Sequence, residues 1–357
     1  MKQLLTHSRM NSFKRCRRRH WWEYEIGLRK DTDARALRMG SAGHAGLDAL
    51  KHGKELYQAL EDVADFYATV PEGVEPYDWE IERETVECLV TGYQWRWANE
   101  VMPVMVSEAP FRLPLTNPDT GAPSTIWELA GKVDGVVEIG NRLAVLEHKF
   151  ISDDLALDGD YWRRLQLDAQ ISLYVWAARK QGWECHGVLY DVVRKPTIRP
   201  SAVPILDADG LKIVLDEAGN RVYNKPKKKA DTIGPPRQTG DTALGYTLQT
   251  RPMSPEEWGD KLLGDIKERP EWYYARVEIA RLDSDLDEMC DEVWDIQKTL
   301  RDTQAKGRWY KTVSRDTCPF CPFFGLCTSR FDPSTGEIPE GFIKVDSVHP
   351  ELEGFDQ

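Results

Sequence analysis

The sequence GKVDGVVEIGNRLAVLEHK, residues 131–149, contains two apolar runs on either side of a Gly-Asn pair. The runs are rich in valine, leucine and isoleucine. A Gly-Asn pair between such runs is typical of a two-residue β-hairpin. We therefore expect strands over residues 127–139 and 142–150, joined by Gly140 and Asn141.

This hairpin brings three charged side chains together. Counting back from the turn along both strands places Asp134 opposite Glu147, and opposed residues project to one face of a sheet. Lys149 lies two residues beyond Glu147 and shares that face. A bulge in either strand would change this register. The alternative interpretation is an exposed trio that only adds charge to the surface.

Two adjacent carboxylates and a lysine suit the hydrolysis of a phosphodiester bond. Neighbouring carboxylates repel each other, and a hard divalent cation such as Mg²⁺ or Mn²⁺ relieves this repulsion by taking oxygen ligands. Such a cation polarises a phosphate and lowers the pKa of a bound water molecule. Lys149 is placed to orient the water or to stabilise the negative charge that develops during the reaction.

The same residues carry a family pattern. Gly131 and Asp134, followed by Glu147 and Lys149, resemble the GxxD…ExK core of the PD-(D/E)xK nuclease superfamily. Val133 stands where the superfamily's name has a proline, a replacement that the RecB-type branch tolerates.

Two further motifs resemble the RecB-type branch. Residues 39–44, Met-Gly-Ser-Ala-Gly-His, resemble its first motif, and residues 170–174, Gln-Ile-Ser-Leu-Tyr, resemble its Q-x-x-x-Y helix motif. The resemblance implies that His44 contributes to the metal site. It also implies that Gln170 and Tyr174 position DNA.

The resemblance implies an α/β fold with a restriction-endonuclease-like core, in which helices flank a mixed central sheet. Mg²⁺ or Mn²⁺ would be bound by Asp134, Glu147 and His44, with the main-chain carbonyl of His148 as a further ligand, and Lys149 would assist the attacking water. The implied activity is an exonuclease that hydrolyses DNA at single-stranded or duplex ends, in repair or recombination. An endonuclease of the same family and a non-catalytic DNA-binding recombination partner are the alternatives.

The polar residues around these motifs have alternative interpretations. Residues 161–180 predict one amphipathic helix, on which Gln166, Gln170 and Tyr174 lie one turn apart. This face would bind phosphates or the metal-bound carboxylates, or it would simply meet solvent. His44 is either structural or a ligand whose imidazole would favour Mn²⁺.

Four cysteines lie near the two ends of the chain. Cys16 is near the start, and Cys318, Cys321 and Cys327 form a C-x2-C-x5-C cluster within residues 316–330. Four thiolates bind one [4Fe–4S] cluster or one zinc ion, and zinc ribbons usually pair two C-x2-C knuckles. The arrangement is similar to the iron–sulfur staple of the AddB nuclease and of CRISPR-associated nucleases. This resemblance implies a [4Fe–4S] cluster that joins the terminal segments.

The 357-residue chain has a net charge of −12 and 41% hydrophobic residues, as is ordinary for a globular enzyme. It shows no membrane-spanning run and no signal peptide, so we expect no membrane contact and a cytoplasmic location. Two basic clusters, residues 14–20 and 225–229, are candidates for phosphate contacts. A solvated charged surface is the alternative, and it is favoured for the second cluster.

We expect one nuclease domain over residues 1–357, with an insertion over 195–251 that is rich in proline, glycine and lysine. No phosphate-binding loop of a helicase motor is present. This leaves open a free-standing enzyme and one that works with a helicase or recombinase partner. Glu108, at the end of an expected strand, is a further candidate for the site. Other helices are expected over 8–25, 35–70, 82–100 and 284–304, and other strands over 104–108, 111–115, 187–193 and 272–279.

Overall fold

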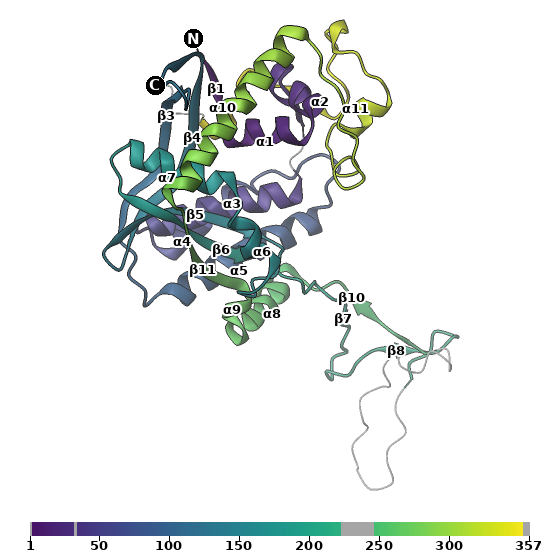
Figure 1. Ribbon diagram of the computed structural model, residues 1–357. Coiled ribbons are helices and arrows are strands. Elements are labelled where there is room, and N and C mark those ends of the chain that lie inside the picture. The colour runs from purple at the N-terminus through teal and green to yellow at the C-terminus, as the bar shows by residue number, and fades with distance from the viewer. Residues whose placement is uncertain (1, 32–33, 223–245, 353–357) are drawn as a thin grey trace.

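The computed structural model describes residues 2–31, 34–222 and 246–352. At its centre is a six-stranded sheet in the order β1–β4–β5–β6–β11, with β3 paired to the other edge of β4 (Figure 1). The pairs β1–β4 and β5–β6 are parallel and the others antiparallel, so the expected mixed sheet is confirmed. The strands are β1 (Gln3–Leu5), β3 (Val104–Thr116), β4 (Pro123–Ile139), β5 (Arg142–Ile151), β6 (Cys185–Arg194) and β11 (Tyr274–Ala280).

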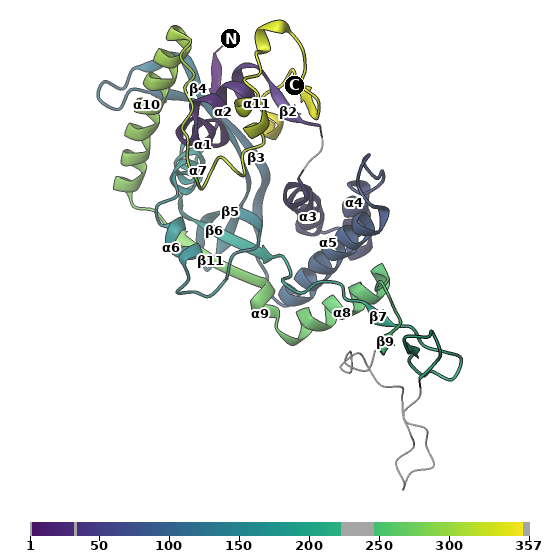
Figure 2. The ribbon, with the colours of Figure 1, turned by 90° about the vertical axis from the view of Figure 1, so that its right-hand side faces the viewer.

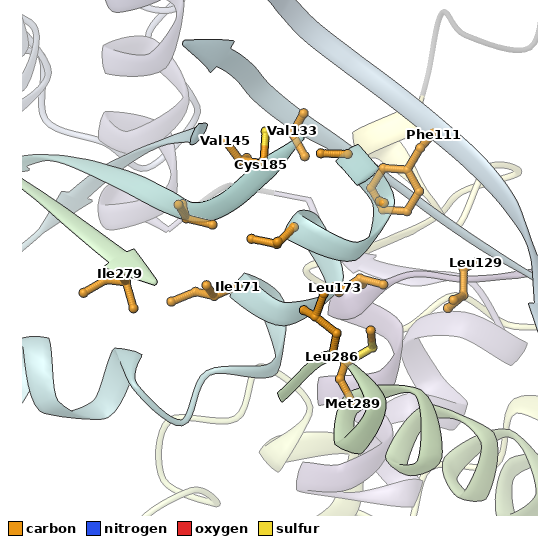
Figure 3. Close-up of a cluster of buried hydrophobic side chains, with 14 of the residues drawn as sticks. Phe111, Leu129, Val133, Val145, Ile171, Leu173, Cys185, Ile279, Leu286 and Met289 are labelled. Carbon is orange, nitrogen blue, oxygen red and sulfur yellow. The ribbon is translucent and has the colours of Figure 1, made fainter. Parts of the chain in front are cut away.

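Helices cover both faces of this sheet (Figure 2). On one face, Leu173 of α7 and Leu286 of α10 belong to one buried cluster with Val133 and Val145 of the sheet (Figure 3). On the other face, α3, α4, α5 and α8 pack over a second cluster that includes Phe150. The main helices are α1 (His7–Arg15), α3 (Arg35–Lys51), α4 (Leu56–Asp65), α5 (Pro76–Trp97), α6 (Asp160–Leu165), α7 (Ala169–Lys180), α8 (Pro255–Glu268) and α10 (Asp283–Lys306).

The hairpin between β4 and β5 has the expected register. The pairs run from Ile139 with Arg142 at the turn to Gly135 with Leu146. Gly140 has φ +51° and the residue after it φ +67°, as a two-residue turn of type I′ requires. No bulge interrupts this ladder, so the predicted register is confirmed up to the pair that precedes Asp134 and Glu147.

Asp134 lies in a gap along one edge of β4. β1 pairs with residues 127–129 of β4, and β5 pairs with residues 135–139. Among the described residues, no strand pairs with this edge between the two ladders. In this gap the side chain of Asp134, and not a main-chain carbonyl of β4, accepts the hydrogen bond of the His148 main-chain N–H on β5.

Three predicted helices, over 161–180, 8–25 and 35–70, are wrong in their continuity. The helix expected over 161–180 is divided, because Asp168 caps the N-terminus of α7 by accepting a hydrogen bond from the main-chain N–H of Gln170. Gln166 lies between the two helices and does not share the face of Gln170. The helix expected over 8–25 breaks at Cys16, whose backbone is extended, with φ −165° and ψ 119°.

The remaining predicted elements differ in their bounds or in how they are divided. The two strands expected over 104–115 are one strand, β3, with an irregularity near Glu108, whose φ is +47°. The helix expected over 35–70 is two helices, α3 and α4, and a short helix precedes β11.

The two ends of the chain lie side by side (Figures 1 and 2). β12 (Phe342–Lys344) pairs antiparallel with β2 (Leu28–Lys30), and α11 (Phe324–Thr328) lies close to the first helices. From the region 195–251, the described parts form two short strand pairs that extend away from the sheet (Figure 1). The basic cluster 225–229 lies outside the described residues.

Candidate functional site

One hydrogen-bonded group surrounds Glu147 on the face of the sheet that α7 covers. Lys149 Nζ donates to the Glu147 carboxylate, and Gln170 Nε2 donates to the same oxygen at 3.2 Å. Gln170 Nε2 also lies 3.0 Å from the hydroxyl oxygen of Tyr174. The structure therefore brings together four predicted site residues from β5 and α7.

Burial changes the acidity of this group. Glu147 is 5% exposed, and burial raises its pKa to about 7, although Lys149 opposes the shift and Asp134 adds to it. Burial alone would lower the pKa of Lys149, but the Glu147 carboxylate outweighs it and the pKa is raised. Near neutral pH, the carboxyl group of Glu147 is thus easily protonated in the absence of another cation.

Asp134 is held from two directions. The main-chain N–H of His148 donates to Asp134 Oδ2 at 2.7 Å, and His44 Nδ1 lies 3.8 Å from the same oxygen. Burial opposes ionisation of Asp134, but the two imidazoles and the N–H outweigh it, so its pKa lies below the usual range. Asp134 is close enough to Glu147 to raise the pKa of that carboxyl group.

His44 is half-buried on α3 and faces Asp134. Burial lowers its pKa to about 4, and Asp134 only partly offsets this effect. The imidazole is therefore neutral at physiological pH and has a lone pair available for a metal ion.

An open cavity of 510 Å³ lies between α3, α4 and the sheet. We call it the acidic cavity, because its described lining contains five acidic and two basic side chains. The charged lining residues are Asp48, Asp62, Asp65, Glu108, Asp134, Lys51 and Lys132. Glu108, a candidate from the sequence, lies at its rim in an ion pair with Lys132 at 2.6 Å.

The candidate metal ligands do not surround a common position. Among residues 2–31, 34–222 and 246–352, no three histidine, cysteine, aspartate or glutamate side chains are placed to share a single metal ion. Lys149 and Gln170 occupy one oxygen of Glu147, and Asp134 turns toward His148 and His44. The imidazole of His148 points to the face opposite Glu147, where Nδ1 lies 3.6 Å from Asp191.

Sequence reasoning missed two groups beside this site. Lys51 Nζ donates to the main-chain oxygen of Asp134 and pairs with Asp48, both at 2.7 Å. Asp48 and Lys51 follow His44 by four and seven residues, so helical spacing could have placed them on its face. The signal was present in the sequence.

The second missed group is a buried ion pair behind His148. Asp191 on β6 is fully buried and accepts hydrogen bonds from Tyr93 and from Arg276 Nε, the latter at 3.1 Å. Arg276 Nη2 also donates to the hydroxyl of Tyr93 at 2.8 Å. These residues come from α5, β6 and β11, and no local spacing in the sequence relates them.

The four predicted cysteines face one cavity. Cys16, Cys318, Cys321 and Cys327 line a space of 250 Å³ between the first helices and α11, and none forms a disulfide. The main-chain N–H of Thr312 donates to the sulfur of Cys16 at 3.4 Å. That of Ser314 donates to Cys318 at the same distance.

Comparison with known proteins identifies the family. The sequence profile described as "PD-(D/E)XK nuclease superfamily" matches residues 4–328. A crystal structure from Eubacterium rectale, described as a "putative exonuclease", is similar with a TM-score of 0.42 and 11% identity, over 98% of this chain and 93% of that one. Among curated proteins, no sequence matches this chain. Since the profile covers most of the chain, including the hairpin with Asp134, Glu147 and Lys149, the chain belongs to the PD-(D/E)XK nuclease superfamily.

Proposed function

We propose that this protein is a metal-dependent deoxyribonuclease of the RecB-like branch, with its active site at the end of the β4–β5 hairpin. The observation that carries the proposal is that, next to the β4–β5 ladder, Asp134 lies close enough to Glu147 to raise its pKa, and Lys149 donates a hydrogen bond to Glu147. A buried carboxylate, Glu147, next to a half-buried one, Asp134, is costly for a fold, and a binding site for a cation would explain why this fold has them.

The donors fit a hard divalent cation. Asp134, Glu147 and His44 would hold Mg²⁺ or Mn²⁺, and the main-chain carbonyl of His148 is a further candidate ligand. The two carboxylates supply the preferred oxygen donors, and the neutral imidazole of His44 is compatible with Mn²⁺. When bound, the cation polarises the scissile phosphate and lowers the pKa of a bound water molecule.

The neighbouring side chains would support the reaction. Lys149 keeps its positive charge because the Glu147 carboxylate raises its pKa, so it orients the attacking water or stabilises the negative charge that develops. Gln170 restrains the Glu147 carboxylate and contacts the hydroxyl of Tyr174. The Gln170–Tyr174 pair then positions the phosphate of the DNA strand.

Within this proposal, the substrate is DNA and cleavage starts at an end, as an exonuclease acting in repair or recombination. An endonuclease is the alternative within the family, and a non-catalytic DNA-binding partner is the alternative outside it. A helicase or recombinase is the partner protein that the proposal accommodates.

A digestion experiment tests the activity. With Mn²⁺ or Mg²⁺, the protein should degrade end-labelled linear DNA and leave covalently closed circular DNA intact. Asp134→Ala and Lys149→Ala should abolish digestion while the circular dichroism spectrum remains that of the wild type. Unchanged digestion by either variant would refute the assignment, and cleavage of the circle would favour the endonuclease.

The cysteine cavity is proposed to hold a [4Fe–4S] cluster. Four thiols from both ends of the chain face one space, and two sulfurs accept main-chain N–H bonds of the kind found around iron–sulfur clusters. Anaerobic purification should yield a brown protein with about four iron atoms per chain, and Cys318→Ser should lose the iron and unfold more easily. A colourless protein with one zinc per chain would favour zinc.

A further inference from the structure

A second cavity lies next to the N-terminus of α3, where Arg35 lines it. Its volume is 600 Å³. Ser152 and Lys195, which directly follow β5 and β6, also line it. Because β5 and β6 are parallel, both strands end at the same edge of the sheet. The cavity therefore lies just past the strand that carries Glu147 and Lys149.

This second cavity is basic. Its described lining contains three cations, Arg35, Lys195 and Arg199, and one acidic side chain, Asp78. We call it the basic cavity. The acidic cavity has the opposite excess, with five acidic and two basic side chains.

A buried carboxylate next to the basic cavity, that of Glu82, already accepts hydrogen bonds from other side chains. Glu82 is 2% exposed and accepts two hydrogen bonds from Arg38, at 2.7 and 2.8 Å, and one from Tyr67 at 3.0 Å. Arg35 lies farther from it, at 3.4 Å, with 60% of its side chain exposed. Burial lowers the pKa of Lys195, and Arg35 adds to this effect. The Glu82 carboxylate is therefore shared by Arg38, Arg35 and Lys195. It does not neutralise all the positive charge that lines the cavity.

The distance to the proposed active site suits a strand of nucleic acid. His44 follows Arg35 by nine residues on α3, which is roughly 13 Å along a helix axis. Ser152 follows Lys149 by three residues, which is roughly 10 Å along an extended chain. The basic cavity is therefore within a few nucleotides of the metal-binding carboxylates.

An aromatic side chain stands at the edge of this cavity. Tyr77 is 36% exposed as a residue, and its hydroxyl donates to the main-chain oxygen of Met253 at 2.9 Å. This hydrogen bond restrains the ring while leaving part of it accessible. Cations that follow a backbone beside a restrained aromatic ring are typical of single-strand binding sites.

We propose that the basic cavity binds the substrate strand a few nucleotides from the scissile bond, with Arg35 and Arg199 on phosphates and Tyr77 stacked on an unpaired base. The inference rests on the proposed nuclease function and specifies its substrate as single-stranded DNA. A volume of 600 Å³ is in the range of small-ligand sites and is enough for a nucleotide of one unpaired strand.

Binding of a labelled 15-nucleotide oligothymidylate, measured by fluorescence anisotropy in EDTA, tests the site without cleavage. The double variant Arg35→Ala/Arg199→Ala should bind about tenfold more weakly at 0.15 M salt. Its salt dependence should fall by about 1.4 in slope, as expected for two lost phosphate contacts. Arg142→Ala/Lys306→Ala removes two exposed cations elsewhere and should bind like the wild type.

Cleavage kinetics separate this inference from the nuclease assignment. With Mn²⁺, the double variant should show about a tenfold higher KM for the 15-mer and an unchanged kcat. Wild-type cleavage with equal binding by both double variants would overturn the inference and leave the nuclease function standing. Absent cleavage with the expected binding difference would refute the nuclease function and support the site. A 15-base-pair duplex that binds as tightly as the single strand would also overturn the inference.

Variants of Tyr77 test the stacking contact. Tyr77→Phe keeps the ring and should retain the wild-type affinity, whereas Tyr77→Leu should bind at least fivefold more weakly, because stacking on one base contributes about 1–3 kcal/mol. Equal affinities for the two variants, with unchanged thermal unfolding, would remove Tyr77 from the proposed site.

Discussion

The acidic and the basic cavity lie along one helix, α3, and differ in charge. His44, Asp48 and Lys51 on the later turns face the first, whereas Arg35 at the start faces the second. One lining residue of each cavity also contacts a buried carboxylate that an arginine holds: His148 of the acidic cavity contacts Asp191, and Arg35 of the basic cavity contacts Glu82. One rigid element can thus position a cation site and an anion site, as cleavage of a polyanion by a metal ion requires.

The largest expected effect on stability comes from removing the arginine that holds each buried carboxylate, Arg276 for Asp191 and Arg38 for Glu82. Arg276→Met leaves Asp191 buried without a cationic partner, and such a loss costs about 3–5 kcal/mol of unfolding free energy. Arg38→Met should cost less, because Arg35 still lies 3.4 Å from Glu82. Urea denaturation of both variants measures the difference. The comparison fails if Arg38→Met is the more destabilised of the two.

The sequence allowed the hairpin next to the acidic cavity to be predicted, because a local rule sets its geometry. The turn at Gly140 sets the register of the hairpin, and the register decides which residues oppose each other. The observed ladder ends at the pair before Asp134 and Glu147, so these two residues, Lys149 and the His44 that the motif order adds stay predictions as site residues.

The basic cavity and the buried contact between Asp191 and Arg276 could not be predicted in the same way. The basic cavity is assembled from α3, α5, α8 and the segment after β6, and only tertiary packing brings these together. Asp191 lies within an apolar strand pattern that gives no sign of a partner on β11. The helix cap by Asp168 separates Gln166 from Gln170. It is a local signal, but the helical periodicity of residues 161–180 favoured one continuous helix in the prediction.

The pH dependence of stability should come from the carboxyl group of Glu147 and not from the basic cavity. The pKa of Glu147 is about 7 in the folded protein, above its ordinary value, so the folded state binds more protons between pH 4.5 and 7. The metal-free protein therefore loses stability as the pH rises through this range, by at most about 3 kcal/mol.

A neutral substitution isolates this contribution. Glu147→Gln should remove most of the loss, so the variant should exceed the wild type in stability at pH 8 and match it more closely at pH 5. Arg35→Gln, in the basic cavity, should leave the pH dependence unchanged. Urea denaturation in EDTA at both pH values measures these differences, and a wild type as stable at pH 8 as at pH 5 would contradict the raised pKa.

Gln170 and Gln166 are the same residue type, and only Gln170 donates a hydrogen bond to Glu147, so their variants form a matched pair. Gln170→Ala removes a hydrogen bond to Glu147 and should lower kcat by roughly 10–100-fold, the usual effect of losing a group that orients a metal ligand. Gln166→Ala should leave kcat unchanged, because Gln166 lies outside α7. Equal losses in both variants would show that the effect comes from the helix and not from the carboxylate.

The smallest expected effect concerns α3 itself, which joins the two cavities. A Cβ at Gly40 would meet no atom within 4 Å, so Gly40→Ala should stabilise the protein by about 0.5–1 kcal/mol through the higher helix propensity of alanine. A Cβ at Gly43 would lie 2.2 Å from the ring of Phe150, and Gly43→Ala should therefore destabilise the protein by about 1–3 kcal/mol.

These two glycines also separate stability from function. Gly43→Ala should push α3 away from β5 next to His44, so it should reduce metal-dependent cleavage as well as stability. Gly40→Ala should leave cleavage unchanged. If both variants are cleavage-competent at wild-type rates, α3 does not need its close approach to Phe150 to position His44, and the metal site depends on the hairpin alone.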